Sequence, residues 1–229
     1  MRPEPRAPTD DLLSGLDAGA GGREVLAEGA VLLRGFARVQ APALLAAVDE
    51  IAARAAFRHM STPGGQRMSV AMTNCGVLGW VADRAGYRYA SVDPESGHAW
   101  PAMPEAFSEL AGRAATEAGY AGFQPDVCLI NRYAPGAKLS LHQDRDETDF
   151  AAPIVSVSLG LPAVFLFGGL RRGDPALRIL LGHGDVVVWG GASRLFHHAV
   201  LPLKAGEHPD SADCRINMTF RRAGPAGAA

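Results

Sequence analysis

The sequence LINRYAPGAKLSLHQDRDE, which spans residues 129–147, guides the interpretation of the whole chain. It contains a His-x-Asp pair formed by His142 and Asp144. In an extended strand, residues two apart point to the same face and lie about 6.6 Å apart along the chain. The imidazole and the carboxylate could therefore converge on one ion. Such a pair is the beginning of the facial triad of two histidines and one carboxylate that holds non-haem iron and leaves coordination positions open.

A triad of this kind needs a second histidine from elsewhere in the chain. His197 and His198 stand side by side in SRLFHH, residues 193–198, and the spacing alone does not choose between them. A histidine near an acid is common on protein surfaces. A His-x-Asp pair followed by a later histidine and an arginine-rich strand is considerably more specific for a metal centre.

The arginine-rich strand is predicted over residues 214–221, CRINMTFR. Its alternation places apolar side chains on one face and polar side chains on the other, and the polar ones are Arg215, Asn217, Thr219 and Arg221. Guanidinium groups bind planar carboxylates through two parallel hydrogen bonds. The polar face could therefore bind a dicarboxylate if it lines the interior of a barrel. If the strand lies at a sheet edge, both arginines would instead be in water.

Two more polar residues share one face of the strand that precedes the His-x-Asp pair. Asn131 and Tyr133 carry an amide and a phenol that could donate hydrogen bonds to the same anion. Alternatively, Tyr133 is a core residue whose hydroxyl is bonded within the protein.

The length of 229 residues indicates one large domain, or one domain with an insertion, and is enough for a sizeable core. The 27 glycines and 16 prolines favour many short elements over a helical bundle. A net charge of −2 means that any nucleic-acid surface must be local. Cys75, Cys128 and Cys214 lack the spacing of a disulfide framework or a zinc site, which favours reduced thiols. Because no stretch is as long as a membrane helix, the sequence predicts a soluble, cytoplasmic protein. We expect it to be a monomer.

The order of patterns along the chain predicts one domain over residues 25–222, between a flexible arm at 1–24 and a disordered tail at 223–229. A helix should open at Pro42, with its apolar face formed by Leu44, Leu45, Val48, Ile51 and Ala52. A second helix is expected over 104–118. Strands are expected over 31–36, 67–73, 127–133, 139–143, 154–161, 163–167, 177–181, 185–189, 199–201 and 214–221. This succession predicts an α+β fold, mainly β, with a jelly-roll core over 127–222.

The segment over residues 57–101 differs from the rest of the chain in its side chains. It is rich in aromatic residues and in arginines, namely Trp80, Tyr87, Tyr89, Trp100, Arg58, Arg67, Arg84 and Arg88. Aromatic rings interleaved with arginines suit stacking on bases and contact with phosphates. The alternative is an ordinary hydrophobic subdomain with solvated arginines.

Taken together, these motifs resemble the AlkB family of Fe(II)- and 2-oxoglutarate-dependent dioxygenases. The resemblance rests on NRY at 131–133, LSLHQD at 139–144, LFHH at 195–198 and RINMTFR at 215–221. It extends to MSVAMTNCG at 68–76, to Trp80, and to WPAMP at 100–104. It covers nearly everything from residue 31 to residue 221 and is closer to the bacterial repair members than to distant ones.

The resemblance implies a role for each matching residue. Iron would be held by His142, Asp144 and His198, because the family motif has its ligand at the second histidine of the pair. The residues that would hold 2-oxoglutarate are Asn131, Tyr133, Arg215, Asn217 and Arg221. Those of a nucleotide-recognition lid over 57–101 would be Trp80, Tyr87 and Tyr89, with Asp146 and Arg172 contacting the base and its surroundings. The implied fold is a double-stranded β-helix with flanking helices and this lid.

The resemblance also implies an activity, which is oxidative demethylation of 1-methyladenine and 3-methylcytosine in single- or double-stranded DNA and in RNA. Fe(II), 2-oxoglutarate and O2 would be required, and formaldehyde and succinate would be released. Asp146 and the aromatic faces would favour the cationic rings of these bases. Two alternatives remain. A 2-oxoglutarate oxygenase for a small molecule or a protein would lack the aromatic lid, and a non-catalytic cupin-like metal-binding module would not need Arg215, Asn217 and Arg221 on one face.

Overall fold

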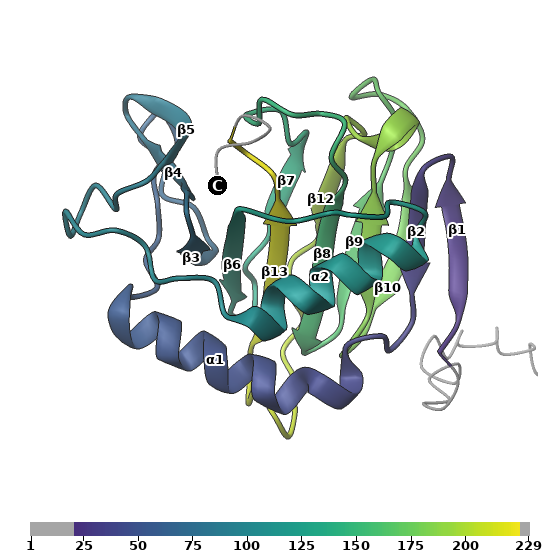
Figure 1. Cartoon of the computed structure of the whole chain (residues 1–229), viewed down its shortest axis with the longest axis horizontal. Coiled ribbons are helices and arrows are strands. Elements are labelled where there is room, and N and C mark those ends of the chain that lie inside the picture. The colour runs from purple at the N-terminus through teal and green to yellow at the C-terminus, as the bar shows by residue number, and fades with distance from the viewer. Residues whose placement is uncertain (1–20, 225–229) are drawn as a thin grey trace, which may run out of the picture.

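Two β-sheets face each other in the computed structural model, which describes residues 21–224 (Figure 1). The larger sheet has the order β1 (Arg23–Ala27), β2 (Ala30–Leu33), β11 (Val186–Trp189), β8 (Ile154–Gly160), β13 (Arg215–Arg221), β6 (Val127–Tyr133) and β3 (Ala71–Gly76). The smaller sheet has the order β10 (Leu177–Leu181), β9 (Ala163–Phe167), β12 (His198–Val200) and β7 (Leu139–His142). Neighbouring strands in both sheets are antiparallel. This arrangement confirms the predicted jelly roll, or double-stranded β-helix.

Alternation along the central strands separates a helix-facing core from an interior between the sheets. On β13, Ile216, Met218 and Phe220 pack into the core beneath the helices. The remaining residues of β13 face the smaller sheet, and the whole strand is buried between β8 and β6. The prediction that the polar face of this strand lines the barrel interior is therefore confirmed, and the alternative of an exposed edge strand is excluded.

Two helices cover the outer face of the larger sheet (Figure 1). The first, α1 (Ala41–Arg54), has proline in its first turn and buries Leu44, Val48 and Ile51 at helical spacing. The second, α2 (Glu105–Glu117), buries Phe107, whose ring meets that of Phe220 edge to face. Short 3-10 turns occur at η1 (Arg38–Gln40) and η2 (Gly191–Ser193). The helices thus close one side of the larger sheet and leave its other side to the interior.

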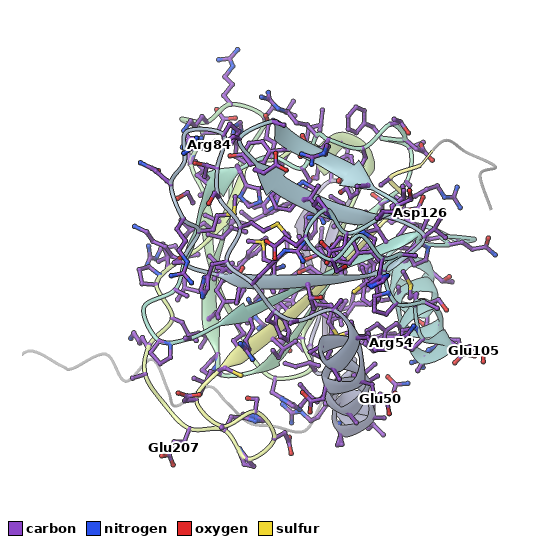
Figure 2. All side chains as sticks on the ribbon, turned by 90° about the vertical axis from the view of Figure 1, so that its left-hand side faces the viewer. Glu50, Arg54, Arg84, Glu105, Asp126 and Glu207 are labelled. Carbon is purple, nitrogen blue, oxygen red and sulfur yellow. The ribbon has the colours of Figure 1, made fainter. Side chains whose placement is uncertain are left out.

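A two-stranded hairpin stands beside the barrel and is formed by β4 (Gly79–Asp83) and β5 (Gly86–Ala90) (Figure 1). Gly79 packs so closely on Trp100 that a Cβ there would overlap the indole. Trp100 in turn donates a hydrogen bond to the carbonyl of Ala90. Figure 2 labels Arg84 at the turn of the hairpin and Glu207 at the opposite end of the molecule. The hairpin is therefore anchored near its base and extends past the barrel.

Several predicted boundaries need correction. Within the predicted arm, Arg23 and Glu24 form the start of β1, and residues 1–20 lie outside the described part. Within the predicted tail, the amides of Ala223 and Gly224 donate to the carboxylate of Asp126, and 225–229 are not described. The predicted lid segment also contains β3, which belongs to the larger sheet because it pairs with β6.

Most of the remaining elements follow the sequence patterns. The bounds of β6, β9 and β10 agree with prediction, and the other strands of the barrel differ by a few residues at their ends. Strand β3 begins at Ala71, later than the predicted start at residue 67. Strands β1, β4 and β5 had not been predicted. Among residues 21–224, none of the helices combines the length and the apolar character needed to cross a membrane.

Candidate active site

Two histidines and one aspartate meet where β7 and β12 run side by side. His142 and His198 are cross-strand partners, and their ring centroids are 4.3 Å apart. Asp144 follows β7, with Oδ1 3.7 Å from Nε2 of His142 and Oδ2 3.8 Å from Nε2 of His198. The potential ligand atoms all lie within 4.8 Å of one another. This set could hold a divalent metal ion and would leave coordination positions open.

The predicted convergence of His142 and Asp144 is observed, although its cause differs from the prediction. We expected both residues on one extended strand, but β7 ends at His142 and the loop that follows turns Asp144 back. Each histidine directs Nδ1 toward a backbone carbonyl, 2.7 Å away at Ser140 and 3.0 Å away at Phe196. These bonds orient the rings and leave Nε2 of each as the metal-facing nitrogen.

The geometry favours His198 over His197 as the third ligand. His197 lies next to a different carbonyl, with Nδ1 3.2 Å from the oxygen of Gly169, and it stands apart from the ligand cluster. Burial, and then the nearby His142, lower the pKa of His198 to about 4. Burial alone would raise the pKa of Asp144, but Arg221, His198 and His142 together outweigh it and hold that pKa below its usual range. Both groups are therefore in their metal-binding protonation state near neutral pH.

A cavity of about 680 Å³ opens from this cluster between the two sheets, and Arg215 lies deep within it. The guanidinium of Arg215 is 5.0 Å from the centroid of the Tyr133 ring, and its Nη2 donates to Ser158 Oγ at 2.8 Å. Its Nε and Nη1 have no hydrogen-bond partner, and the hydroxyl of Tyr133 has none either. Among the described residues, no carboxylate pairs with Arg215, although it is only 1% exposed. Because buried charges normally require a partner, this end of the cavity fits a carboxylate ligand.

The other residues predicted to hold the dicarboxylate form most of their hydrogen bonds with groups of the protein. Arg221 donates through Nε and Nη2 to Oδ2 of Asp144, at 3.1 and 2.7 Å, and only Nη1 lacks a partner. Asn217 donates to Ser156 Oγ and to the carbonyl of Val157, at 2.8 and 3.0 Å. Its oxygen accepts from Thr219 and from Asn131, whose own Oδ1 is unpartnered. Arg215, Tyr133 and Asn131 therefore face the cavity with free groups, whereas Asn217 contributes mainly by holding its neighbours.

The hairpin supplies an aromatic wall at the mouth of the cavity. Trp80 and Tyr87 lie diagonally across β4 and β5, and their rings stack at 5.6 Å with an interplanar angle of 13°. The indole N–H of Trp80 donates to Oδ2 of Asp146 at 2.9 Å. Arg172, which also lines the cavity, donates to the carbonyl of Leu141 at 2.9 Å. Trp80, Tyr87, Asp146 and Arg172 therefore come together at the mouth of the cavity.

One detail of the predicted substrate site needs correction. Tyr89 is not among the residues that line the cavity, because its hydroxyl donates inward to Oε1 of Glu147 at 2.6 Å. Asp146, which also lines the cavity, lies in the loop after β7, which ends at His142. It reaches the mouth through the path of the loop, where it is held by Trp80.

The sequence interpretation missed two buried charged residues beside the ligands. The side chains of Glu147 and Arg194 are 1% and 3% exposed and pair at 3.0 Å. Their only sequence signal is proximity to the ligand motifs, since Glu147 ends the quoted stretch and Arg194 precedes His198 in SRLFHH. Ser156, which lines the cavity, and Ser158, which accepts from Arg215, were also missed, although their alternation in β8 could have indicated a polar interior face.

A second cluster of potential ligands, His183, His208 and Asp210, lies away from this site. The backbone N–H of Gly160 donates to Nδ1 of His183 at 3.0 Å. A neutral imidazole that accepts through one nitrogen carries its proton on the other, so Nε2 of His183 is a donor. Nε2 then faces Asp210 Oδ2 at 3.6 Å, which is an electrostatic contact beyond hydrogen-bond distance.

Comparison with known proteins identifies the class to which this fold and site belong. The sequence matches the family model of the 2OG-Fe(II) oxygenase superfamily over residues 29–221. That range includes both sheets of the barrel from β2 onward and all three residues of the ligand cluster. The chain belongs to this superfamily and is a dioxygenase that uses Fe(II), 2-oxoglutarate and O2.

Individual relatives define the family more narrowly. The chain is 64% identical over 202 residues to the alpha-ketoglutarate-dependent dioxygenase AlkB of Escherichia coli strain K12, an alignment that covers 88% of this chain and 94% of that protein. It is 36% identical over 133 residues to the nucleic acid dioxygenase ALKBH1 of Mus musculus, covering 58% and 33% of the two chains. The solved structure of OsALKBH1 matches with a TM-score of 0.77 at 30% identity, covering 88% and 100%. Within the superfamily, the chain is a member of the AlkB family.

Proposed function

We propose that this dioxygenase removes methyl groups from the nitrogen atoms of nucleic acid bases, with 1-methyladenine and 3-methylcytosine as substrates. The observation that carries the proposal is the combination of two sites in one cavity. The metal cluster and the free groups of Arg215 line its interior, and the Trp80–Tyr87 stack lines its mouth. The mouse relative is a nucleic acid dioxygenase, and its likeness supports a nucleic acid substrate.

The residues around the metal would prepare the reaction. We assign Fe(II) to His142, Asp144 and His198, whose protonation states and orientations suit metal binding. When bound, iron and 2-oxoglutarate supply the chemistry that reduces O2, converts the keto acid to succinate and CO2, and hydroxylates the N-methyl group. The hydroxymethyl group then leaves nitrogen as formaldehyde and returns the unmodified base.

The free groups deep in the cavity would bind and orient the keto acid. Arg215 offers Nε and Nη1, and the nearby Tyr133 hydroxyl offers a further donor to the same carboxylate. Arg221 has one free donor, Nη1, beside the metal ligands, and Asn131 has an unpartnered amide oxygen. Groups at both ends of β13 would therefore bind the co-substrate and fix its orientation in the cavity.

The mouth of the cavity suits a flipped-out, positively charged base. The face of the Trp80–Tyr87 stack offers a platform for a ring, and Asp146 supplies a negative charge beside it. Among the described residues, Oδ1 of Asp146 accepts no hydrogen bond. The lining also contains several basic residues that could contact phosphates, namely Arg67, Lys138, Arg145 and Arg172. A local basic rim of this kind is compatible with a net charge of −2.

The aromatic wall favours this function over the two alternatives. An oxygenase acting on a small molecule would not need the stacked pair of a separate hairpin, and a metal-binding module would not need the unpaired Arg215. We further propose that the enzyme acts as a monomer in the cytoplasm, on single- or double-stranded DNA and on RNA. The three cysteines, which are unpaired thiols, are compatible with a reducing compartment.

The proposal can be tested by mass spectrometry of methylated oligonucleotides. Oligonucleotides with 1-methyladenine or 3-methylcytosine, incubated with enzyme, Fe(II), ascorbate and 2-oxoglutarate, should lose the mass of one methylene as succinate and formaldehyde accumulate. The His142→Ala variant is the matched control and should leave the oligonucleotides unchanged. If the unmutated enzyme forms succinate but removes no methyl group from any of these DNA or RNA substrates, the proposal is wrong.

A further inference from the structure

The loop after β7 carries two adjacent acids that bond to both strands of the hairpin. Trp80 and Tyr89 are cross-strand partners in β4 and β5. The Trp80 indole donates to Asp146, at the mouth of the cavity, and the Tyr89 hydroxyl donates to Glu147, in the interior. A two-point contact therefore docks the hairpin onto the same short loop that positions Asp144.

Glu147 connects this contact to the metal ligand through two arginines. Its Oε1 lies 3.2 Å from Nε of Arg221, and its Oε2 accepts from Nη2 of Arg194 at 3.0 Å. Both arginines also hold Asp144. Arg221 donates to the carboxylate, and Nη1 of Arg194 donates to the backbone carbonyl at 2.8 Å. The orientation of the ligand carboxylate and the path of its backbone thus depend on guanidinium groups that Glu147 holds in place.

The charge balance of this network explains why Glu147 is needed. Two cations and two carboxylates are brought together, and all four side chains are at most 9% exposed. Without Glu147, Arg194 would lose its only carboxylate partner within residues 21–224, and of these carboxylates Asp144 alone would face Arg221. Breaking a buried pair leaves an uncompensated charge. Arg221 would then compete with the metal ion for the charge of Asp144.

We propose that Glu147 is a positioning residue of the metal centre and that the Tyr89 hydroxyl links the docking of the hairpin to it. Glu147 sets the orientation of Asp144 through Arg221 and Arg194. The Tyr89 hydroxyl donates its hydrogen bond to Glu147 only while the hairpin lies against the loop. The second part rests on the proposed function, because it takes the hairpin as the element that meets the base. The first part concerns the metal site alone.

The role of Glu147 can be measured by Co(II) binding without turnover. Co(II) in place of Fe(II) gives visible absorption that reports affinity and coordination. Glu147→Gln, which keeps the shape and an acceptor for Tyr89, should weaken Co(II) binding by about 10- to 100-fold, the typical effect of removing a residue that supports a metal ligand. The spectrum of the bound ion should change as well. Wild-type affinity and an unchanged spectrum in a variant with normal thermal melting would overturn the assignment.

The role of Tyr89 can be measured by the stimulation of keto-acid turnover. Succinate formation is followed with and without a 1-methyladenine oligonucleotide. Tyr89→Phe removes one hydroxyl and should reduce the stimulation by the oligonucleotide, while Co(II) binding weakens less than in Glu147→Gln. Stimulation equal to that of the wild type would overturn the link. If the oligonucleotide fails to stimulate the wild type, the proposed function and the link both fail, and the Co(II) titration still decides the role of Glu147.

Asp83→Asn is the matched control on the same hairpin. Asp83 pairs with Arg88 and bonds to the amide of Ala85 at the turn, and its side chain is 42% exposed. Loss of this pair perturbs the hairpin without touching Glu147. Co(II) affinity and stimulation should therefore equal those of the wild type. Losses in Asp83→Asn as large as those in Tyr89→Phe would show a general sensitivity of the hairpin and would overturn the specific link.

Discussion

The two arginines at opposite ends of β13 are equally buried but differ in what their guanidinium groups contact. Arg215 and Arg221 are 1% and 6% exposed and lie on the same face of one strand. Arg221 is surrounded by the carboxylates of Asp144 and Glu147. Arg215 has a serine hydroxyl and an aromatic face as neighbours, and two of its nitrogens lack a partner. Carboxylates of the protein balance the charge of Arg221, although its Nη1 stays free, whereas no carboxylate of the described residues lies beside Arg215.

The difference shows how one strand can serve two tasks. Burial lowers the pKa of Arg215, with no carboxylate to offset it. Burial acts in the same direction on Arg221, but Asp144 and the other acidic groups around it together outweigh burial and raise that pKa. The charge of Arg221 is therefore balanced by carboxylates of the protein, and its guanidinium group orients the metal ligand Asp144. The Arg215 end carries an unfavourable buried charge that a bound carboxylate would relieve.

The largest effect is expected when one of the metal ligands near Arg221 is removed. His142→Ala and His198→Ala should each abolish succinate formation, because each removes a ligand nitrogen from the cluster. His197→Ala should retain activity, because His197 faces the carbonyl of Gly169. Iron-dependent succinate release is the measurement. Activity in His198→Ala together with inactivity in His197→Ala would reverse the ligand assignment.

The comparison itself is tested by replacing each arginine with methionine. Arg215→Met should weaken 2-oxoglutarate binding by about 3–5 kcal/mol, because a buried charged pair with the ligand is lost. The ligand-free protein should become more stable by about 1–3 kcal/mol, because unsatisfied donors are removed. Arg221→Met should have the opposite effect on stability, with a loss of about 3–5 kcal/mol, because Asp144 and Glu147 remain.

The measurements are calorimetry of 2-oxoglutarate on the Mn(II)-loaded protein and chemical unfolding of the ligand-free protein. Addition of 2-oxoglutarate should raise the unfolding free energy of the wild type and leave that of Arg215→Met unchanged. If both methionine variants change stability in the same direction, the two ends of β13 do not differ in the way proposed.

Much of this comparison could be predicted from local patterns. The alternation of residues 214–221 indicated a polar and an apolar face, and the strands flanking the ligands have nearly the predicted bounds. A strand pattern repeats every two residues, so a short window of sequence is enough to determine which side chains share a face. The His-x-Asp pair was informative for the same reason, although a loop rather than a strand brings its two residues together.

The partners of each charged group could not be predicted in this way. Asp144 and Arg221 are 77 positions apart, and Glu147 and Arg194 are 47 apart, so no local pattern relates them. Both arginines of β13 therefore looked alike in the sequence and were assigned to the same ligand. Tyr89 was assigned to the substrate for a similar reason, since the packing of the hairpin decides which aromatic residues face the cavity.

A smaller effect is expected at the mouth of the cavity, beyond the Arg221 end. Asp146→Asn keeps an acceptor for the Trp80 indole and removes only the charge. Because Asp146 is exposed, its interaction with a cationic base is screened and should contribute at most about 1 kcal/mol. Demethylation of 1-methyladenine should fall about fivefold relative to neutral 1-methylguanine. Equal losses on both bases would remove the argument for charge selection.

The smallest effect concerns the pH dependence of stability near the Arg215 end. Gly160, the cross-strand partner of Arg215, donates its N–H to Nδ1 of His183. Protonation of His183 would replace this acceptor with a second donor and break the bond. Burial and then His208 hold the pKa of His183 below its ordinary value of 6.5. The unfolded chain therefore takes up this proton at a higher pH than the folded protein does, and the stability present above about pH 6.5 is lost as the pH falls.

Asparagine can accept the same hydrogen bond without titrating, so His183→Asn should unfold like the wild type above pH 7 and lose stability less steeply below pH 6.5. Chemical unfolding of the metal-free proteins across this range is the measurement, and identical slopes for the two proteins would show that His183 does not contribute to the acid sensitivity of this end.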